Sequence, residues 1–425
     1  MRRLYTILIY LGLPLILLRI LWKSLRNPDY RLRISERFGI FPSLAADRSI
    51  WVHAVSVGEA QAAEPMIRWL LDQYPHTPVV VTTTTPTGSE RVRALFGESV
   101  FHVYFPYDIP LAIRGFLSRV RPLMLVMVET EIWPNLIEEC HRNNIPTLLA
   151  NARLSEKSAR GYARLGSFTR EIFGKIGLIA AQAPVDAERF LGLGVPHDRV
   201  RVTGSIKFDI KLNASLHEQA EVLRRSWGHR PIWVAASTHE GEEEQILAAH
   251  NRILLAHTEA LLVLVPRHPE RFERVHALCV QQGFSVAKRY SMDHCGLDKT
   301  VLLGDTMGEL MLFYATADAA FVGGSLVSTG GHNVLEPAAL GVPVLFGPHM
   351  FNFSVISRLL LAENAAVQIA NTQALAEVLV RWFSDASERT RIGENALRVV
   401  EANKGALERL VELIKELLDG QVSGA

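Results

Sequence analysis

Short apolar runs alternate along most of the chain with longer stretches in which apolar residues recur at helical spacing. The runs of the first half are rich in Val, Ile and Thr, and they predict strands at 50–56, 79–85, 102–106, 123–129, 146–151, 178–182 and 200–204. Helical patterns separate most of these runs. This alternation is typical of βαβ units, in which parallel strands form one sheet.

The same cycle starts again in the second half, after a stretch at 206–230 that lacks a strand pattern. It predicts strands at 232–237, 260–266, 284–288, 300–304, 319–324, 343–347 and 365–369, followed by a helical pattern from 388. The sequence therefore predicts an α/β protein with two doubly wound, Rossmann-like domains that face a cleft. Ligands of such sheets bind beyond the carboxyl ends of the strands.

The chain has 425 residues, which is enough for about two or three domains. We expect five parts, namely a membrane anchor (1–22), an N-terminal Rossmann-like domain (23–205), a connector (206–230), a C-terminal Rossmann-like domain (231–387) and a C-terminal helical segment (388–425).

The N-terminus combines an apolar run with positive charge. Residues 4–18 are uncharged, and after Arg19 the apolar pattern continues to Trp22. Because a bilayer core needs about 20 helical residues, this run is at the short limit for a membrane span. A helix that spans the membrane and one that lies in its interface are both compatible with the run. A secretory signal peptide fits poorly, since no small-residue cleavage site follows. The structural alternative is a buried core helix.

Charge is unevenly distributed along the chain. Residues 1–40 carry eight Lys or Arg and two acids, whereas the whole chain has a net charge of +1. Positive charge after the apolar run keeps the following domain in the cytoplasm under the positive-inside rule, and it favours anionic lipid as a partner. No basic stripe with interleaved aromatic residues occurs elsewhere, so nucleic acid is not an expected partner.

Several enzyme classes lack their signature motifs in this sequence. The chain has three scattered cysteines and no CxxC pair, which disfavours a cysteine zinc site or a disulfide framework. It has no GxGxxG after a strand and no GxxxxGK[ST], so a nicotinamide enzyme and a P-loop NTPase are disfavoured. No Asp-x-Asp pair is present to hold a metal with a sugar diphosphate. We therefore expect neither a cofactor nor a metal.

Three strand ends in the second half carry candidate nucleotide-binding loops. Two glycine pairs, at 323–324 and 330–331, precede a helix on which Asn333 and Glu336 share a face. Glycines permit close approach of the backbone to a ligand, and a helix N-terminus can bind phosphate. A carboxylate there can bind ribose hydroxyls. The alternative is an ordinary loop with a helix cap.

The other two loops follow neighbouring apolar runs. Arg267 ends the strand at 260–266 and can bind a phosphate or a carboxylate, although it could also be a solvated loop residue. The segment 304–310 opens a helix and offers further backbone N–H groups, with the alternative that Thr306 only caps that helix. Three such loops on one sheet favour a nucleotide site.

The first domain supplies carboxylates at strand ends. Glu59 joins the strand at 50–56 to a helix, Glu129 ends the strand at 123–129, and Lys207 lies near the domain junction. Each also has a purely structural explanation, since acids in the first turn suit the helix dipole and a junction lysine is usually solvated.

Eight segments in order resemble the bacterial 3-deoxy-D-manno-oct-2-ulosonic acid (Kdo) transferases of lipopolysaccharide assembly. They are SVGE (56–59), TPTGSERV (85–92), ETEIWPN (129–135), NARLS (151–155), GSIKFD (204–209), PRHPERF (266–272), GDTMGEL (304–310) and GGHNVLEPA (330–338). The resemblance covers essentially the whole chain, including the N-terminal anchor.

The resemblance implies a GT-B glycosyltransferase that moves Kdo from CMP-Kdo to the lipid A precursor lipid IVA. It implies inversion of the anomeric centre without metal, at the cytoplasmic face of the inner membrane. By matching motifs, Glu59 is the implied general base, and Glu129 and Lys207 stabilise the transition state. The residues implied to bind CMP are Pro266, Arg267, Met307, Gly308, Glu309, Asn333, Val334, Leu335 and Glu336.

Two rival interpretations remain at this stage. A nucleotide-sugar epimerase can share the two-domain fold, but it needs no membrane segment. A membrane-tethered scaffold that binds nucleotide without catalysis would tolerate Glu59→Gln without loss of function.

Overall fold

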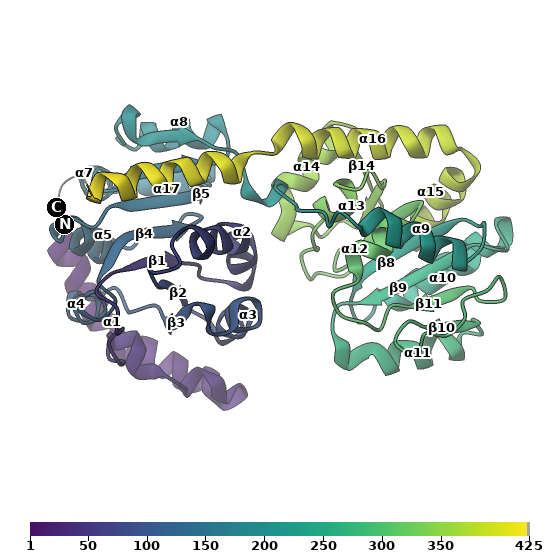
Figure 1. Cartoon of the computed structure of the whole chain (residues 1–425), viewed down its shortest axis with the longest axis horizontal. Helices are drawn as coiled ribbons and strands as arrows, with labels where there is room; N and C mark the ends of the chain where they lie inside the picture. The colour runs from purple at the N-terminus through teal and green to yellow at the C-terminus, as the bar shows by residue number, and fades with distance from the viewer. Residues whose placement is uncertain (423–425) are drawn as a thin grey trace. The chain divides into compact units, whose positions relative to one another are not determined.

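The computed structural model describes residues 1–422 and divides into two compact units (Figure 1). Unit 1 combines Met1–Asp209 with the chain from Lys404 onward, and unit 2 is Ile210–Asn403. The last three residues of the predicted C-terminal segment, 423–425, lie outside the described residues.

Unit 1 contains a parallel sheet of seven strands in the order β3-β2-β1-β4-β5-β6-β7. The strands are β1 (Ser49–His53), β2 (Val79–Thr83), β3 (Phe101–Tyr104), β4 (Pro122–Val128), β5 (Thr147–Ala152), β6 (Leu178–Ala181) and β7 (Val200–Val202). Each coincides with one of the seven strands predicted for the first half. The strands are apolar on both sides because helices cover both faces of the sheet.

The two faces of this sheet form separate cores. Ile50 and Val52 of β1 pack with apolar residues of α2 and α17 on one face, and Trp51 packs with α4 and α5 on the other. The helices of unit 1 besides α1 are α2 (Val57–Gln73), α3 (Pro86–Phe96), α4 (Pro110–Val120), α5 (Pro134–Arg142), α6 (Glu156–Ala163), α7 (Ser167–Phe173), α8 (Pro184–Gly192) and α17 (Ala406–Val422).

Unit 2 repeats the architecture with the strand order β10-β11-β9-β8-β12-β13-β14, again all parallel. Its strands coincide with the seven predicted for the second half. They are β8 (Ile232–Thr238), β9 (Leu261–Pro266), β10 (Val286–Lys288), β11 (Val301–Leu303), β12 (Ala319–Val322), β13 (Val344–Phe346) and β14 (Ala366–Gln368). The prediction of two doubly wound α/β domains is therefore confirmed.

Helices cover both faces of the second sheet as well, and Trp233 and Trp382 are fully buried in one of its cores. The helices of unit 2 are α9 (Leu216–Ser226), α10 (Glu243–Ala256), α11 (Phe272–Gln281), α12 (Leu310–Thr316), α13 (Leu335–Ala338), α14 (Ser354–Ala362), α15 (Thr372–Ser384) and α16 (Ala386–Asn403).

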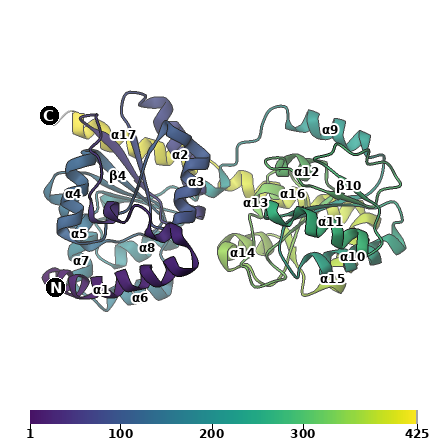
Figure 2. The same cartoon turned by 90° about the horizontal axis from the view of Figure 1, so that it is seen from below.

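The boundaries between the parts differ from those expected. The predicted connector contains the 3-10 turn Ile206–Phe208 in unit 1 and helix α9 in unit 2. The predicted C-terminal segment breaks at Gly405, where φ is +85°, into α16 of unit 2 and α17 of unit 1 (Figures 1 and 2). The Asp209 carboxylate accepts the N–H groups of Gly405 and Leu407, both at 2.6 Å, so it caps the start of α17.

Each sheet has a switch point, where the chain has completed the strands on one side of the sheet and begins those on the other side. In unit 1 this point lies between β1 and β4, and in unit 2 it lies between β8 and β12. In doubly wound sheets, ligands bind in the crevice at this point, outside the carboxyl ends of the strands. The residues that follow these four strands are therefore the first candidates for a site.

Helix α1 (Arg2–Arg26) contains the predicted anchor and has the length and composition of a membrane span. Its first turns contact the rest of unit 1, because the Tyr5 hydroxyl donates to Asp108 at 2.8 Å and the Thr6 hydroxyl donates to Asn135 at 2.8 Å. Beyond these turns the exposed apolar side chains of α1 are Ile7, Leu8, Tyr10, Leu11, Leu15, Leu18, Leu21, Trp22 and Leu25. The helix therefore starts on the protein surface and presents a long apolar stretch to its surroundings.

Candidate active site

Glu59 lies in the first turn of α2, shortly after β1. Its carboxylate accepts the Val55 N–H at 2.6 Å and the Ser56 hydroxyl at 2.9 Å. The Ser56 oxygen in turn accepts the Glu59 N–H at 3.3 Å, and this reciprocal pattern caps the helix. The capping role that the sequence left open is therefore present, and it holds the carboxylate at the carboxyl edge of the sheet.

Burial raises the pKa of the Glu59 carboxyl from 4.5 to about 7. The hydrogen bonds from Val55 and Ser56 lower this pKa, whereas the charges of Glu129 and Glu131 raise it. A general base works best when its pKa lies near the working pH. The surroundings of Glu59 thus suit proton abstraction near neutral pH.

Glu129 follows β4, the strand next to β1 at the switch point of unit 1. Its Oε1 accepts a hydrogen bond from Lys207 Nζ at 2.8 Å, and both side chains are about one-third exposed. The backbone of Glu129 has φ of +61°, a left-handed conformation that costs a non-glycine residue about 1–2 kcal/mol. The structure therefore brings two of the predicted site residues into contact, on a strained backbone.

Asn151, in the NARLS segment, is a residue to which the sequence analysis assigned no role. It is the second-last residue of β5, near Glu129, has φ of +53° and is 1% exposed. Its Oδ1 accepts the Ile206 N–H at 3.2 Å, which holds the turn that carries Lys207. Its Nδ2 has no hydrogen-bond partner within residues 1–422. A polar residue after a buried apolar strand was the signal that could have identified it.

Arg267 lies directly after β9 in unit 2, as expected. Its backbone N–H donates to the Thr238 carbonyl at the end of β8, at 3.0 Å. No ion pair to its guanidinium occurs among the described residues, although the charge of Arg267 lowers the pKa of Glu336 against the larger effect of burial, which raises it. The guanidinium is thus a cation at the carboxyl edge that no neighbouring carboxylate neutralises by direct contact.

The loop at 304–310 leads into helix α12 and takes part in an internal ion pair. Glu309 forms an ion pair with Arg289, with N–O distances of 2.6 Å and 3.0 Å, and also accepts a hydrogen bond from the Thr306 hydroxyl. Helix α12 begins only at Leu310, so Thr306 does not cap it. Since the Glu309 carboxylate is occupied, its segment offers a ligand mainly its backbone and the exposed Met307 side chain.

The glycine-rich loop after β12 binds an internal carboxylate. The fully buried Glu242 accepts the N–H groups of Gly324, Ser325 and Leu326 at 2.7, 3.1 and 2.9 Å. These amides are therefore not free for a phosphate, and the sequence analysis did not identify Glu242. Farther along the loop, the Asn333 side chain donates to Glu336 at 3.1 Å. Helix α13 begins only at Leu335, so the two side chains meet, but Asn333 precedes the helix and does not share a helix face with Glu336.

Comparisons with known proteins identify the family. A family model described as 3-deoxy-D-manno-octulosonic-acid transferase (kdotransferase) matches residues 32–210. The 3-deoxy-D-manno-octulosonic acid transferase of Haemophilus influenzae is 43% identical over 422 residues, which are 98% of this chain and 99% of that protein. This chain belongs to the Kdo transferase family. It is accordingly a glycosyltransferase, and the epimerase and scaffold interpretations lose their support.

Solved structures agree with the fold of a Kdo transferase of the GT-B type. The crystal structure of Acinetobacter baumannii MurG aligns with 87% of this chain and with 100% of the MurG chain. The TM-score is 0.55 and the sequence identity is 14%. The UDP-GlcNAc 2-epimerase of Neisseria meningitidis covers 87% of this chain and 100% of its own, with a TM-score of 0.55 at 15% identity. At such identities the likeness concerns the fold alone.

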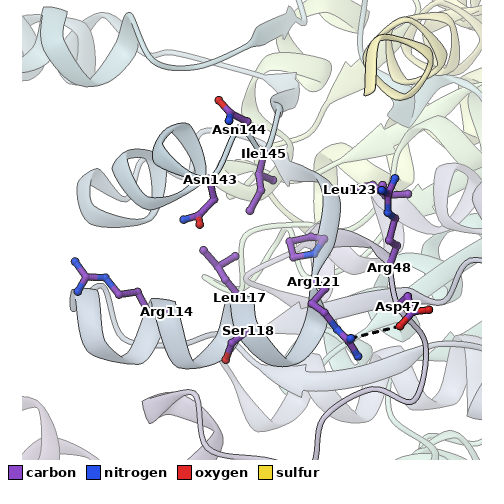
Figure 3. Close-up of a pocket in the computed structure, with 11 residues that line it drawn as sticks. Asp47, Arg48, Arg114, Leu117, Ser118, Arg121, Leu123, Asn143, Asn144 and Ile145 are labelled. Atoms are coloured by element: carbon purple, nitrogen blue, oxygen red, sulfur yellow. Dashed lines mark ion pairs between the residues drawn. The ribbon is translucent and has the colours of Figure 1, made fainter. Parts of the chain in front are cut away.

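A cavity of about 490 Å³ lies elsewhere in unit 1 of this Kdo transferase family member (Figure 3). Pro122 and Leu123 line it at the amino end of β4, opposite the edge that carries Glu129. Two of its arginines are already paired, Arg114 with Glu139 at 3.0 Å and Arg121 with Asp47 at 3.5 Å. The cavity is therefore separate from the candidate active site.

Proposed function

We propose that this protein transfers Kdo from CMP-Kdo to the lipid A precursor lipid IVA, with inversion, at the cytoplasmic face of the inner membrane. Membership of the Kdo transferase family supports the donor, the acceptor and a role in lipopolysaccharide biosynthesis. The observation that carries the mechanism is the half-buried Glu59, with its pKa raised to about 7, beside the Glu129–Lys207 pair.

Inversion in a single displacement needs one base on the face of the sugar opposite the leaving group. The acceptor hydroxyl oxygen attacks the anomeric carbon of Kdo while Glu59 takes its proton. The bond between that carbon and the phosphate oxygen breaks, and its electron pair leaves with CMP. Glu129 and Lys207 stabilise the charges that develop around the reacting sugar. Fixed charges are effective there because they need no reorganisation during the reaction.

The donor nucleotide is held by unit 2 in this proposal. Arg267 binds the phosphate, and the preceding Pro266 sets its place at the end of β9. Asn333 to Glu336 bind the ribose, with the Glu336 carboxylate accepting from the hydroxyls. Because Arg289 occupies the Glu309 carboxylate, Met307, Gly308 and Glu309 contact the base through their backbone.

The acceptor is a lipid, and α1 provides the membrane contact that such an acceptor requires. Its exposed apolar residues and the basic residues around 19–37 fit an anionic membrane surface. Both a spanning and an interfacial helix are compatible with these features.

The proposed reaction uses no metal. No group of three or more His, Cys, Asp or Glu in residues 1–422 is arranged to hold one.

The deciding experiment incubates the full-length protein with CMP-Kdo and lipid IVA and weighs the lipid product by mass spectrometry. We expect a mass increase of one or two Kdo residues, retained in the presence of EDTA. Glu59→Gln serves as the matched inactive control. A lipid of unchanged mass with a folded, membrane-bound protein would contradict the proposal.

A further inference from the structure

Two histidines of unit 2 contact each other at the edge where the donor is proposed to bind. The Nε2 atoms of His239 and His332 lie 2.8 Å apart, and the two rings are parallel within 2°, with their centroids 5.1 Å apart. His239 follows β8 and His332 lies in the loop after β12. These are the strands on either side of the switch point in this sheet, where doubly wound folds bind their ligands.

The fold holds this pair in place through Glu242. The Glu242 carboxylate accepts the His239 N–H at 3.3 Å, in addition to the amides of the glycine-rich loop, so it ties the two loops together. Gly324 has φ of +66°, and a Cβ at that position would lie 3.0 Å from the His332 ring and 3.3 Å from the His239 ring. A glycine at this position therefore leaves the space that both rings occupy.

The charges around the pair are mainly positive. Within residues 1–422, Arg267 has no carboxylate in direct contact, whereas Arg271 is paired with the buried Glu243 at 3.1 Å. The titratable or charged groups that act on the two rings are His268, Arg267 and Arg271, whereas Glu242 binds the backbone N–H of His239. Burial has the largest effect and lowers the pKa of both histidines, and the positive neighbours lower these pKa values further. The pKa of His332 falls to about 3.

The pair is thus neutral near pH 7 when no ligand is bound. A hydrogen bond between the two Nε2 atoms needs one donor and one acceptor, and a pair that carries one additional proton still satisfies this need. An anion close to the rings would favour that additional proton, since an opposite charge nearby stabilises the charged form of a histidine.

We propose that the His239–His332 pair binds an oxyanion at the reacting end of the donor and takes up one proton as it does so. This inference rests on the proposed function. In the donor named above, the anomeric carbon carries two oxyanions, the phosphodiester and the Kdo carboxylate, and either could be the group recognised. The proton on the pair would then offset the negative charge that reaches the phosphate oxygen when its bond to the sugar breaks.

The test measures proton uptake on binding by the full-length protein. Calorimetric titrations in two non-phosphate buffers of different ionisation enthalpy, at several pH values between about 6.5 and 8.5, give the number of protons bound with each ligand. The ligands are CMP, which has only the phosphate; free Kdo, which has only the carboxylate; CMP-Kdo, which has both; and cytidine, which has neither. Above the second pKa of a phosphate monoester, about 6, the phosphate of CMP itself contributes little to the number of protons exchanged on binding.

We expect uptake approaching one proton between the pKa of the free pair and the higher pKa of the bound pair. In that range the affinity falls by up to about tenfold per pH unit as the pH rises, the limit for one linked proton, and it levels off above the pKa of the bound pair. Uptake with CMP assigns the phosphate, and uptake only with CMP-Kdo or free Kdo assigns the carboxylate. If CMP and CMP-Kdo bind without proton uptake, the inference is overturned while the proposed nucleotide site stands. If neither binds at all, the nucleotide site itself is overturned, and the inference with it.

Two variants connect the uptake to these residues. His239→Gln and His332→Gln keep a hydrogen-bonding side chain but do not titrate, so each should abolish the uptake and flatten the pH dependence. His217→Gln, on the exposed face of α9, is the matched control and should behave as the native protein. Since the native protein alone shows whether a proton is taken up, the inference can be refuted even if a variant fails to fold. Undiminished uptake in both folded variants would also overturn it.

Discussion

Lys207 Nζ donates a hydrogen bond to Glu129 Oε1 at 2.8 Å, although the two residues are 78 positions apart in the sequence. Lys207 lies on a 3-10 turn after β7, at one edge of the sheet, while Glu129 follows the central strand β4. The turn reaches the centre of the edge because the buried Asn151 binds its Ile206 N–H. The pair is therefore assembled by the tertiary fold and not by sequence proximity.

Replacing Lys207 by Ala should lower turnover about 10²–10³-fold, the usual effect of removing one group that stabilises a transition state. CMP affinity should stay within a few-fold of the native value, because Lys207 lies in unit 1 and the proposed CMP contacts lie in unit 2. Steady-state rates and calorimetry measure the two effects. Lys157→Ala, on the exposed surface of α6, is the control. A Lys207→Ala variant with native turnover would exclude Lys207 from the mechanism.

Glu59→Gln should lower turnover about 10²–10⁴-fold, since glutamine keeps the shape of the side chain but cannot take the proton. The same residue caps α2 through Val55 and Ser56, and a purely structural role would lower the melting temperature instead. A thermal melt beside the rate assay separates these effects. A folded variant with near-native turnover would leave the base unassigned, with Glu129 and Glu131 as the next candidates.

The pH dependence of the native enzyme gives a second check on Glu59. Its pKa is raised to about 7, so below that pH the carboxyl is increasingly protonated and cannot act as a base. The turnover number kcat should therefore fall about tenfold per pH unit below pH 7 and level off above it. Rates across pH 5–8.5 with donor and acceptor both saturating measure this profile, because saturation removes the pH dependence of donor binding. A flat profile down to pH 5 would show that a group with an ordinary carboxyl pKa is the base.

Replacing Glu336 by Ala should weaken CMP binding by about 1.5–3 kcal/mol, the range for a hydrogen bond to a charged group. Arg267→Ala should weaken it by a similar amount and should affect cytidine less, because cytidine lacks the phosphate. Calorimetry with the two ligands measures both. Glu363→Ala, exposed after α14, is the control. Unchanged CMP affinity in both variants would remove the nucleotide site from unit 2 as described.

Glu242→Ala should lower the free energy of unfolding by about 3 kcal/mol or more, because several buried N–H groups lose their only carboxylate partner. Glu242→Gln should cost less, since its carbonyl oxygen still accepts some of these bonds. Denaturant unfolding of both variants, beside the exposed Glu244→Ala, measures the difference. Equal stability of Glu242→Ala and the native protein would show that these amides find other partners.

The positions of the strands along the chain could be predicted from the sequence because helices cover both faces of each sheet. Strands in such a sheet are continuous apolar runs. Glu59, Glu129 and Arg267 could be placed at strand ends for the same reason. The contacts of these residues could not be predicted in this way. The Glu129–Lys207 pair and the His239–His332 pair join loops that are far apart in the chain. A local sequence pattern does not show which distant loops lie in contact.

Two loops have partners that the sequence did not reveal. The glycines at 323–324 were expected to permit close approach of the backbone to a ligand, and the buried Glu242 from another loop accepts the amides of Gly324 and its neighbours. The segment at 304–310 was expected to offer backbone N–H groups, and Arg289 binds the Glu309 carboxylate in that segment. In both loops the partner comes from another part of the chain, and only the tertiary structure reveals it.

The apolar surface of α1 should hold the protein at the membrane. Deleting residues 1–22 should release much of the protein from membranes while CMP binding persists, but the deletion also removes the contacts of Tyr5 and Thr6 with unit 1. A sharper variant is Leu11→Asp with Leu18→Asp, two changes on exposed residues beyond those contacts. A charge in the bilayer is costly, so this variant should also move to the soluble fraction.

Sedimentation with membranes at low and high salt measures the effect of these changes. Leu255→Asp, at an exposed position of α10 in unit 2, is the control and should sediment like the native protein. High salt should release more of the α1 variants than of the native protein, because only the basic flank at 19–37 would still hold them, and salt screens that attraction. If both α1 variants sediment as fully as the native protein at high salt, α1 is not the anchor.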